Sequence, residues 1–238
     1  MTLSGRTLYK DGDWNTICLP FDVTLSGSPL AGATARTLTS ASITGTTLTL
    51  TFGDAVDELV AGTPYIIKWT ADANYVDDDA HNIVNPVFEG VTVDATDRSF
   101  TSGSGDTKVS FLGTYKCTSF TGEDKSILFL GEDNTLYYPQ PDIDTENPEN
   151  SKFPTIGAFR AYFKIGEDGA GARSLTAFDI NFSDESTGIR EIDTDPAPSP
   201  SPTGVGRSAW YTHDGRKLDG KPTKSGVYIR EGKKVIVK

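Results

Sequence analysis

The sequence predicts an all-β protein: an antiparallel β-sandwich body followed by a small C-terminal antiparallel β-sheet domain. Three observations lead to this fold class. Threonine, a β-branched residue that suits strands, recurs along most of the chain. Apolar and polar residues alternate with period two in many short segments. Clusters of glycine, proline, asparagine and aspartate separate these segments, as is typical of turns between the strands of a sandwich.

Three segments show the alternation most clearly, and each predicts a half-buried antiparallel strand. The residues expected on their apolar faces are Leu48, Leu50 and Phe52; Phe159, Ala161, Phe163 and Ile165; and Phe178, Ile180 and Phe182. Further strands are expected within 14–21, 64–69, 87–93, 108–115 and 125–130.

A single segment resembles a helix. In residues 54–62, Val56, Leu59 and Val60 would share one face over about two turns, and Gly62 would supply the C-cap.

The composition changes twice along the chain and predicts three parts. Residues 1–183 form the body, either one domain or two with a break near 93–105. Residues 184–205 are rich in proline and serine, and the alternating prolines from Pro196 to Pro202 favour an extended linker. Residues 206–238 form the small β domain, which is shorter than the ~40 residues at which unaided folding becomes common.

Charge is distributed unevenly between these parts. The whole chain has a net charge of −11, but the residues from Gly206 onward carry nine basic and three acidic side chains, which leaves about −17 on the rest. The acidic body repels phosphate backbones, so nucleic acid is not an expected partner of the body. The basic C-terminal domain either touches nucleic acid or an anionic lipid, or is simply solvated. No run approaches the ~18 apolar residues that a membrane span needs.

The two cysteines leave two alternatives open. A disulfide between Cys18 and Cys117 would stabilise the fold by roughly 4–5 kcal/mol in the chain-entropy model. The other alternative is two buried thiols, because free cysteine behaves as a small apolar residue. Residues 1–10 lack the apolar stretch of a signal peptide, so either the protein is cytoplasmic or a leader precedes this sequence.

The sequence contains no recognisable catalytic motif. It has no nucleophile elbow, zinc-binding HExxH or Walker loop, and whether the protein is an enzyme stays open, with the balance toward a non-enzyme. The imidazoles are His81 and His213, and we interpret His81 as a loop residue because a metal site needs several ligands placed together.

Calcium is the one cofactor that the composition suggests. No other cofactor is expected. Two acidic runs carry the oxygen ligands that calcium prefers, although neither has the glycine of an EF-hand loop and solvated surface loops are the alternative. The candidate ligands are Asp72, Asn74, Asp77 and Asp79 in the first run, and Asp142, Asp144 and Glu146 in the second.

Trp14 and Trp69 are the candidate ligand-binding residues of the body. A tryptophan can stack on a sugar ring through its flat apolar face, but both residues lie in apolar segments, where core packing is the alternative.

The C-terminal domain contains a hairpin signal. Residues 231–232 separate two apolar segments, which predicts a two-residue connection, and the segment around Trp210 should supply a third strand. Read strand by strand, the alternation places Val227, Ile229, Val235 and Val237 on one face, with Tyr228 and Ile236 on the other.

These 33 residues resemble the C-terminal sorting domain of the type IX secretion system of gram-negative bacteria. The matching residues are Trp210, Asp214, Gly215, Pro222, Gly226, Tyr228 and Gly232. Segments 11–23, 61–69, 85–91 and 156–165 resemble, less sharply, uncharacterised β-rich modules that precede such tails. The resemblance implies secretion or surface-anchoring machinery as a partner and an extracellular or cell-surface location.

The expected function is therefore a secreted or cell-surface β-rich module with a structural, adhesive or ligand-binding role. A glycan or a host protein is the expected ligand. The alternative is a carbohydrate-active hydrolase or its accessory carbohydrate-binding module, which a row of exposed aromatic residues flanked by acids would favour.

Overall fold

The computed structural model describes residues 1–71, 81–120, 125–139, 154–167, 175–183 and 186–192, and the backbone of four strands beyond residue 209. Two compact units are present, Met1–Ser199 and Pro200–Lys238, which we call the body and the tail. Nearly all regular structure is β, which confirms the predicted all-β class. The sandwich arrangement stays a prediction.

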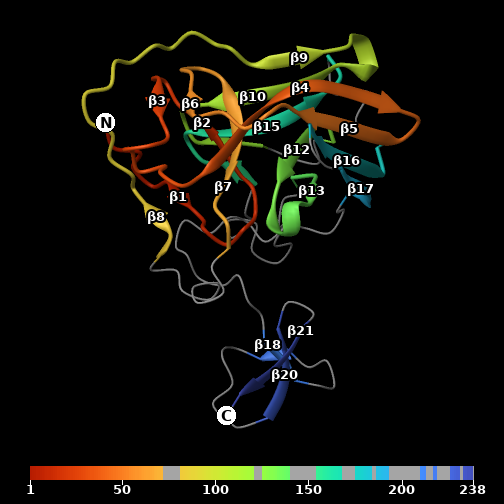
Figure 1. The fold of residues 1–238 in the computed structure, drawn as a ribbon. Coiled ribbons are helices and arrows are strands. Elements are labelled where there is room, and N and C mark those ends of the chain that lie inside the picture. Colours follow the sequence, from red (N-terminus) through yellow and green to blue (C-terminus); the bar gives the residue numbers. More distant parts are fainter. Residues whose placement is uncertain are drawn as a thin grey trace, which may run out of the picture. The chain divides into compact units, whose positions relative to one another are not determined.

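The larger sheet of the body has six strands (Figure 1). Their order from edge to edge is β17 (Ser186–Glu191), β16 (Ala177–Phe182), β5 (Thr47–Phe52), β4 (Thr34–Thr44), β7 (Pro64–Lys68) and β2 (Asn15–Cys18). The second sheet has five strands, in the order β13 (Leu136–Tyr137), β12 (Ile127–Leu130), β15 (Arg160–Ile165), β10 (Val109–Thr114) and β9 (Phe100–Ser102).

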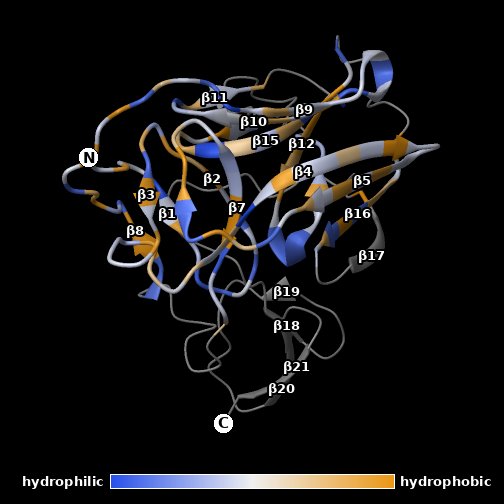
Figure 2. Ribbon diagram, turned by 45° about the horizontal axis from the view of Figure 1, so that its top comes forward, coloured by the Kyte–Doolittle hydropathy of each residue, from blue (hydrophilic) through white to orange (hydrophobic). Residues whose placement is uncertain are grey.

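The predicted alternation is confirmed in β5, β15 and β16. In each of these strands every second residue is buried and its neighbours are half-buried, and Figure 2 lets the reader follow this pattern by hydropathy. Phe159 departs from it, because its φ of 59° places it in a turn before β15 begins. The period-two pattern therefore identified which residues enter the core.

One strand pairing differs from the antiparallel arrangement that the sequence suggested. β16 runs parallel to β5, with Phe178 opposite Leu48 and Phe182 opposite Phe52. The chain completes the whole five-stranded sheet between these two strands and returns in the same direction. Such a pairing depends on distant segments, so the local pattern contains no signal for it.

The two large sheets contribute to one shared hydrophobic core. Phe52, Leu50 and Phe178 enter it from the six-stranded sheet, and Phe111 and Phe163 enter it from the five-stranded sheet. The rings of Phe111 and Phe163 stack with their centroids 4.6 Å apart. An aromatic pair of this kind adds about 0.5–1.5 kcal/mol to the effect of area burial.

A second core lies against the β2–β7 side of the body. It includes Phe21, Leu30, Trp69 and Phe88, and two short ribbons lie in this part of the chain. They are β1 (Thr7–Leu8) with β8 (Ile83–Val84), and β3 (Val23–Thr24) with β6 (Glu58–Leu59). All four residues of β2 are buried, which explains why its sequence shows no alternation.

A third, smaller core involves the five-stranded sheet and a two-stranded ribbon. The ribbon pairs β11 (Thr118–Ser119) with β14 (Thr155–Ile156). Ile127, Phe129 and Ile156 are buried together, and Phe120 and Tyr162 pack against them. Phe120 meets the rings of Phe129 and Tyr162 edge to face. Short 3₁₀ turns at Gly105–Thr107 and Glu132–Asn134 complete the described elements of the body.

The predicted helix at 54–62 is wrong. Val56 forms an isolated β-bridge with Ala35, and Leu59 lies in β6. Gly62 has a φ of +75°, as a C-cap would, but it belongs to a turn. Two turns of helical spacing are too short a signal to outweigh pairing with neighbouring strands.

The limits of the body also differ from those that the sequence suggested. Residues 1–199 form one compact unit. Segment 85–99, drawn in Figure 1 as the long trace joining β8 to β9, runs into the region 93–105 where the two-domain alternative placed its break. We call this segment the strap. β17 pairs with β16, so the first part of the expected linker 184–205 is a strand of the body's sheet.

The tail contains a four-stranded antiparallel sheet in the order β19 (Lys217–Leu218), β18 (Trp210–Thr212), β20 (Gly226–Arg230) and β21 (Lys233–Val237). The predicted hairpin and third strand are both confirmed, with Arg230 opposite Lys233 and Trp210 opposite Arg230.

The expected faces of the tail hairpin are wrong, however. Tyr228 lies opposite Val235, and Val227 lies opposite Ile236. Residues opposite each other in an antiparallel pair share a face, so each face receives apolar residues from both strands.

Candidate functional site

Both candidate tryptophans of the body are core residues. Trp14 is 7% exposed and Trp69 is 4% exposed. Trp14 stacks on Phe182 with a centroid distance of 5.4 Å, and the Lys68 ammonium lies 4.5 Å from the centroid of the Trp14 ring. Trp69 donates its indole N–H to the Ala31 carbonyl at 3.0 Å. The structure therefore favours the core-packing alternative over sugar stacking for both residues.

The candidate calcium ligands lie outside the described residues. This holds for the whole first set (Asp72, Asn74, Asp77 and Asp79) and the whole second set (Asp142, Asp144 and Glu146). Within the described parts of the chain, no group of three or more His, Cys, Asp or Glu residues could hold a metal ion. His81 is half-buried, and His213 is not described.

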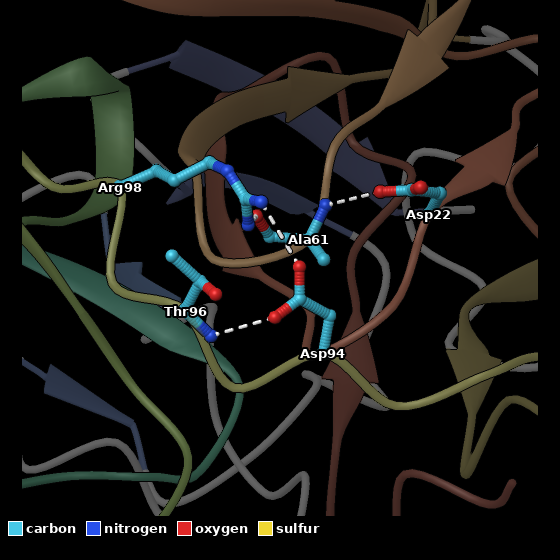
Figure 3. Close-up of polar contacts among 5 residues, drawn as sticks. All are labelled: Asp22, Ala61, Asp94, Thr96 and Arg98. Atoms are coloured by element: carbon cyan, nitrogen blue, oxygen red, sulfur yellow. Dashed lines mark hydrogen bonds and ion pairs between the residues drawn. The ribbon is translucent and has the colours of Figure 1, made fainter.

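A polar network fastens the strap to the rest of the body (Figure 3). The Asp94 carboxylate accepts hydrogen bonds from the Thr96 amide and from the Arg98 guanidinium, both at 2.9 Å. Arg98 also donates to the Ala61 carbonyl at 2.7 Å, and the Ala61 amide donates to the Asp22 carboxylate at 2.7 Å. We call these five residues the clamp.

The backbone of the clamp requires a glycine at position 62. A Cβ atom there would lie 1.8 Å from the Thr96 carbonyl oxygen, and the φ of +75° is itself unfavourable for other residues. The Gly62 carbonyl accepts a hydrogen bond from the Arg98 amide at 3.1 Å. The strap thus rests directly on the turn that contains Gly62.

The electrostatics of the clamp indicate a structural role. Hydrogen bonds from Thr96, with a further contribution from Arg98, lower the pKa of the Asp94 carboxyl to about 2. A carboxylate held in this way stays ionised and engaged at neutral pH, so it is poorly suited to exchange protons with a substrate.

Cys18 occupies a tight place between β2 and β10. A Cβ atom on Gly113 would lie 2.2 Å from its sulfur, and its thiol lies 3.9 Å from the Tyr115 hydroxyl. Burial raises the pKa of the Cys18 thiol to about 11, so the thiol is protonated and unreactive near neutral pH. Cys117 is exposed and both cysteines are free, which differs from the disulfide and also from two buried thiols.

Arg6 is a buried charged residue that the sequence did not reveal. Its guanidinium donates to the carbonyls of Thr7 at 2.8 Å and Thr16 at 2.6 Å, which ties the N-terminal segment to β2. Burial, reinforced by the nearby charge of Arg160, lowers its pKa well below the usual value. The segment around Arg6 reads as an ordinary polar start, so no sequence signal could have identified this role.

The strands of the tail segregate their charged residues to one end of the sheet. One row of directly opposed residues consists of Leu218, Trp210, Arg230 and Lys233. The next row, on the opposite face, consists of Lys217, Tyr211, Ile229 and Lys234. We call these two rows the basic end. The other described strand residues of the tail are uncharged.

The tail residues behind the resemblance are only partly described. Trp210, Gly226 and Tyr228 lie in strands β18 and β20. Asp214, Gly215, Pro222 and Gly232 lie outside the described residues.

Comparison with known proteins adds no relative. No family model matches the chain, and no match is found among curated proteins or solved structures. Within the described residues, no helix is long and apolar enough to cross a membrane.

Proposed function

We propose that this chain is a secreted or cell-surface β-rich module of a gram-negative bacterium. In this proposal the body has a structural, adhesive or ligand-binding role, and the tail sorts or anchors the protein. The observation that carries the proposal is the division of the chain into two compact units, the second with a four-stranded sheet of its own. A separate module at the end of a chain can be recognised independently of the body's ligand.

Several features of the body support a role other than catalysis. The clamp and Arg6 use their polar groups to join loops and strands to one another. The Cys18 thiol, a nucleophile by residue type, is buried and protonated. Each of these groups serves the fold, which is what a scaffold for binding or display requires.

The carbohydrate alternative loses its main support. It relied on accessible faces of Trp14 and Trp69, which are buried. Among the side chains that the structure describes, Tyr115 is the one aromatic residue in the exposed class, at 36%. A single exposed ring does not form the aromatic row that this alternative requires.

Deletion of residues 200–238 tests the proposal in the native host. We expect the shortened chain to fold but to be lost from the cell surface, measured by surface labelling and fractionation. The matched control is the full chain with Val84→Ala, a change at an exposed position of the body. Normal display of the shortened chain would contradict the role of the tail.

A further inference from the structure

The middle of the strap is a stretch of backbone without partners. The Phe88 amide donates to the Met1 carbonyl and the Asp94 amide donates to the Pro20 carbonyl, both at 2.7 Å. Between these two anchors, residues 89–93 make no hydrogen bond or ion pair in the described part of the chain. We call residues 89–93 the open segment. Figure 1 shows the strap that contains it running along the outside of the body.

The open segment also presents an apolar side chain to solvent. Val93 is 61% exposed, the highest value among the exposed large apolar residues that the structure describes. Val60, whose carbonyl closes the turn that contains Gly62, is 40% exposed. Val91 is half-buried and packs against the second core, so it holds the segment to the body. Unpaired backbone together with an exposed valine is the kind of surface that an added β-strand covers.

Space for an added strand is present beside the open segment. A Cβ atom built on Gly90 would have no neighbouring heavy atom within 4 Å. Glu89, Thr92 and Val93 are all exposed, so nothing in the described chain covers them. An extended chain can therefore approach this backbone without displacing other residues.

We propose that the open segment is a docking site for an extended segment of a partner protein, in which aliphatic and basic residues alternate and which adds to the body as a β-strand. In strand addition, the backbone hydrogen bonds supply affinity and alternate side chains supply specificity. The open segment thus gives the ligand-binding role of the body a ligand class, and in that respect the inference rests on the proposed function.

The charges around the open segment favour a basic partner. The strap and the clamp together contain four acidic residues and one basic residue, which are Asp22, Glu89, Asp94, Asp97 and Arg98. Arg98 is already paired with Asp94, whereas Glu89 and Asp97 are exposed and have no ion pair within the described residues. Basic residues in the added strand would meet opposite charge, which speeds association and excludes acidic competitors. A second copy of this chain would instead bring another acidic strap against the first.

The test titrates the full chain with a synthetic peptide in which lysine and valine alternate. We expect the amide NMR signals of residues 89–93 to shift and their hydrogen exchange to slow, and we expect this binding to weaken as salt is raised. Two control peptides separate the contributions. One has glutamate in place of every lysine. The other keeps all side chains but carries a methyl group on every backbone nitrogen, so it cannot donate hydrogen bonds to a strand. Neither control peptide should bind.

Two variants locate the docking site. Val93→Ser should weaken binding of the lysine–valine peptide by about fivefold or more, because a covered valine loses apolar contact area. The matched control is Val84→Ser. Val84 is 59% exposed, nearly as much as Val93, but it lies in β8, whose backbone is already paired with β1. This control should change binding by less than about twofold. Amide spectra of β5 verify that both variants keep the fold.

Unchanged signals from residues 89–93 in the presence of the peptide would overturn the proposal. Equal binding of the methylated peptide would overturn strand addition, and equal binding of the glutamate peptide would overturn the preference for a basic partner. Shifts of the same amides with rising protein concentration, before any peptide is added, would assign the open segment to a second copy instead. These measurements do not depend on surface display, so they can fail while the deletion of residues 200–238 still supports the proposed function.

Discussion

The body and the tail are both built from β-sheets, yet they organise apolar and charged residues differently. In the body, large sheets and short ribbons share three cores. Two described ion pairs, Arg98 with Asp94 and Lys108 with Glu167, join opposite charges at its surface. In the tail, one four-stranded sheet carries charges of one sign, gathered at one end. In the body, burial decides where the apolar residues lie. In the tail, the register of the paired strands decides where the charged residues gather.

The comparison teaches where function can be sought in this chain. Buried residues of the body, such as Trp14 and Trp69, were candidates by residue type, but their packing commits them to the fold. In the tail, residue type alone marked out no group, and the structure revealed one. Its residues form a distinctive group only after the strands are paired, because Leu218, Trp210 and Arg230 come from three strands.

The largest expected effect is on the shared core of the body. Phe163→Ala should destabilise the body by roughly 3–5 kcal/mol, because it removes a ring that is 1% exposed and stacked on Phe111. Chemical denaturation measures this effect. Val84→Ala, at a position that is 59% exposed, should stay within about 0.5 kcal/mol of the unmodified chain. If the amide signals of the tail sheet disappeared together with the body, the two units would not be independent.

A comparable loss is expected in the tail from Trp210→Ala. Trp210 lies opposite Leu218 on one side and Arg230 on the other. We predict that its ring packs on the sheet, and replacing a packed aromatic residue with alanine costs about 3–5 kcal/mol. A short unit has little stability to lose, so its sheet should unfold while the body stays intact. Amide signals from Gly226–Arg230 report the tail, and Lys217→Ala in the same sheet is the control. Retention of the β20 signals would show that Trp210 does not support the sheet.

Much of the fold followed from local sequence, and the exceptions have physical causes. Alternation identified the buried positions of β5, β15 and β16, because a strand exposes its faces in turn. The parallel pairing of β16 with β5 was not predictable, since it depends on where the chain returns after another sheet. The faces of the tail hairpin could have been predicted: a two-residue connection places Arg230 opposite Lys233 and fixes every other pair.

The candidate sites were less predictable than the fold. The clamp brings Asp22, Ala61 and Asp94 together from separate segments, and none of these residues has a motif around it. Arg6 is buried through contacts that depend on tertiary packing. The acidic runs were identified by composition alone, and calcium binding there stays a prediction.

A smaller effect is expected where the strap crosses Gly62. Gly62→Ala and Gly90→Ala both place a side chain at a positive φ, which costs roughly 1–2 kcal/mol in each case. A Cβ atom at position 90 meets open space, whereas one at 62 meets the Thr96 carbonyl. Gly62→Ala should therefore lower the free energy of unfolding by roughly 1–3 kcal/mol more than Gly90→Ala does, as measured by thermal or denaturant unfolding. If both variants lost the same free energy of unfolding, the strap would have moved away from the added Cβ atom at no measurable cost.

The smallest expected effect is an acid-dependent loosening of the clamp. Because the pKa of Asp94 is lowered from 3.8 to about 2, its contribution is present above about pH 4 and is lost as the pH falls toward 2. The Thr96 amide, which donates to Asp94, should shift over this interval in a titration followed by NMR. Asp94→Asn should abolish that shift. A midpoint near 4 would contradict the fastening of Asp94 by Thr96 and Arg98.

Limited proteolysis followed by mass spectrometry tests the two-unit account most directly. The proline- and serine-rich sequence after Ile192 should be cut first, because extended backbone fits a protease and β17 is paired in the body's sheet. We predict early fragments that end or begin between residues 193 and 209, with the body intact. First cuts within Thr47–Phe52 or Arg160–Ile165 would contradict the division into body and tail.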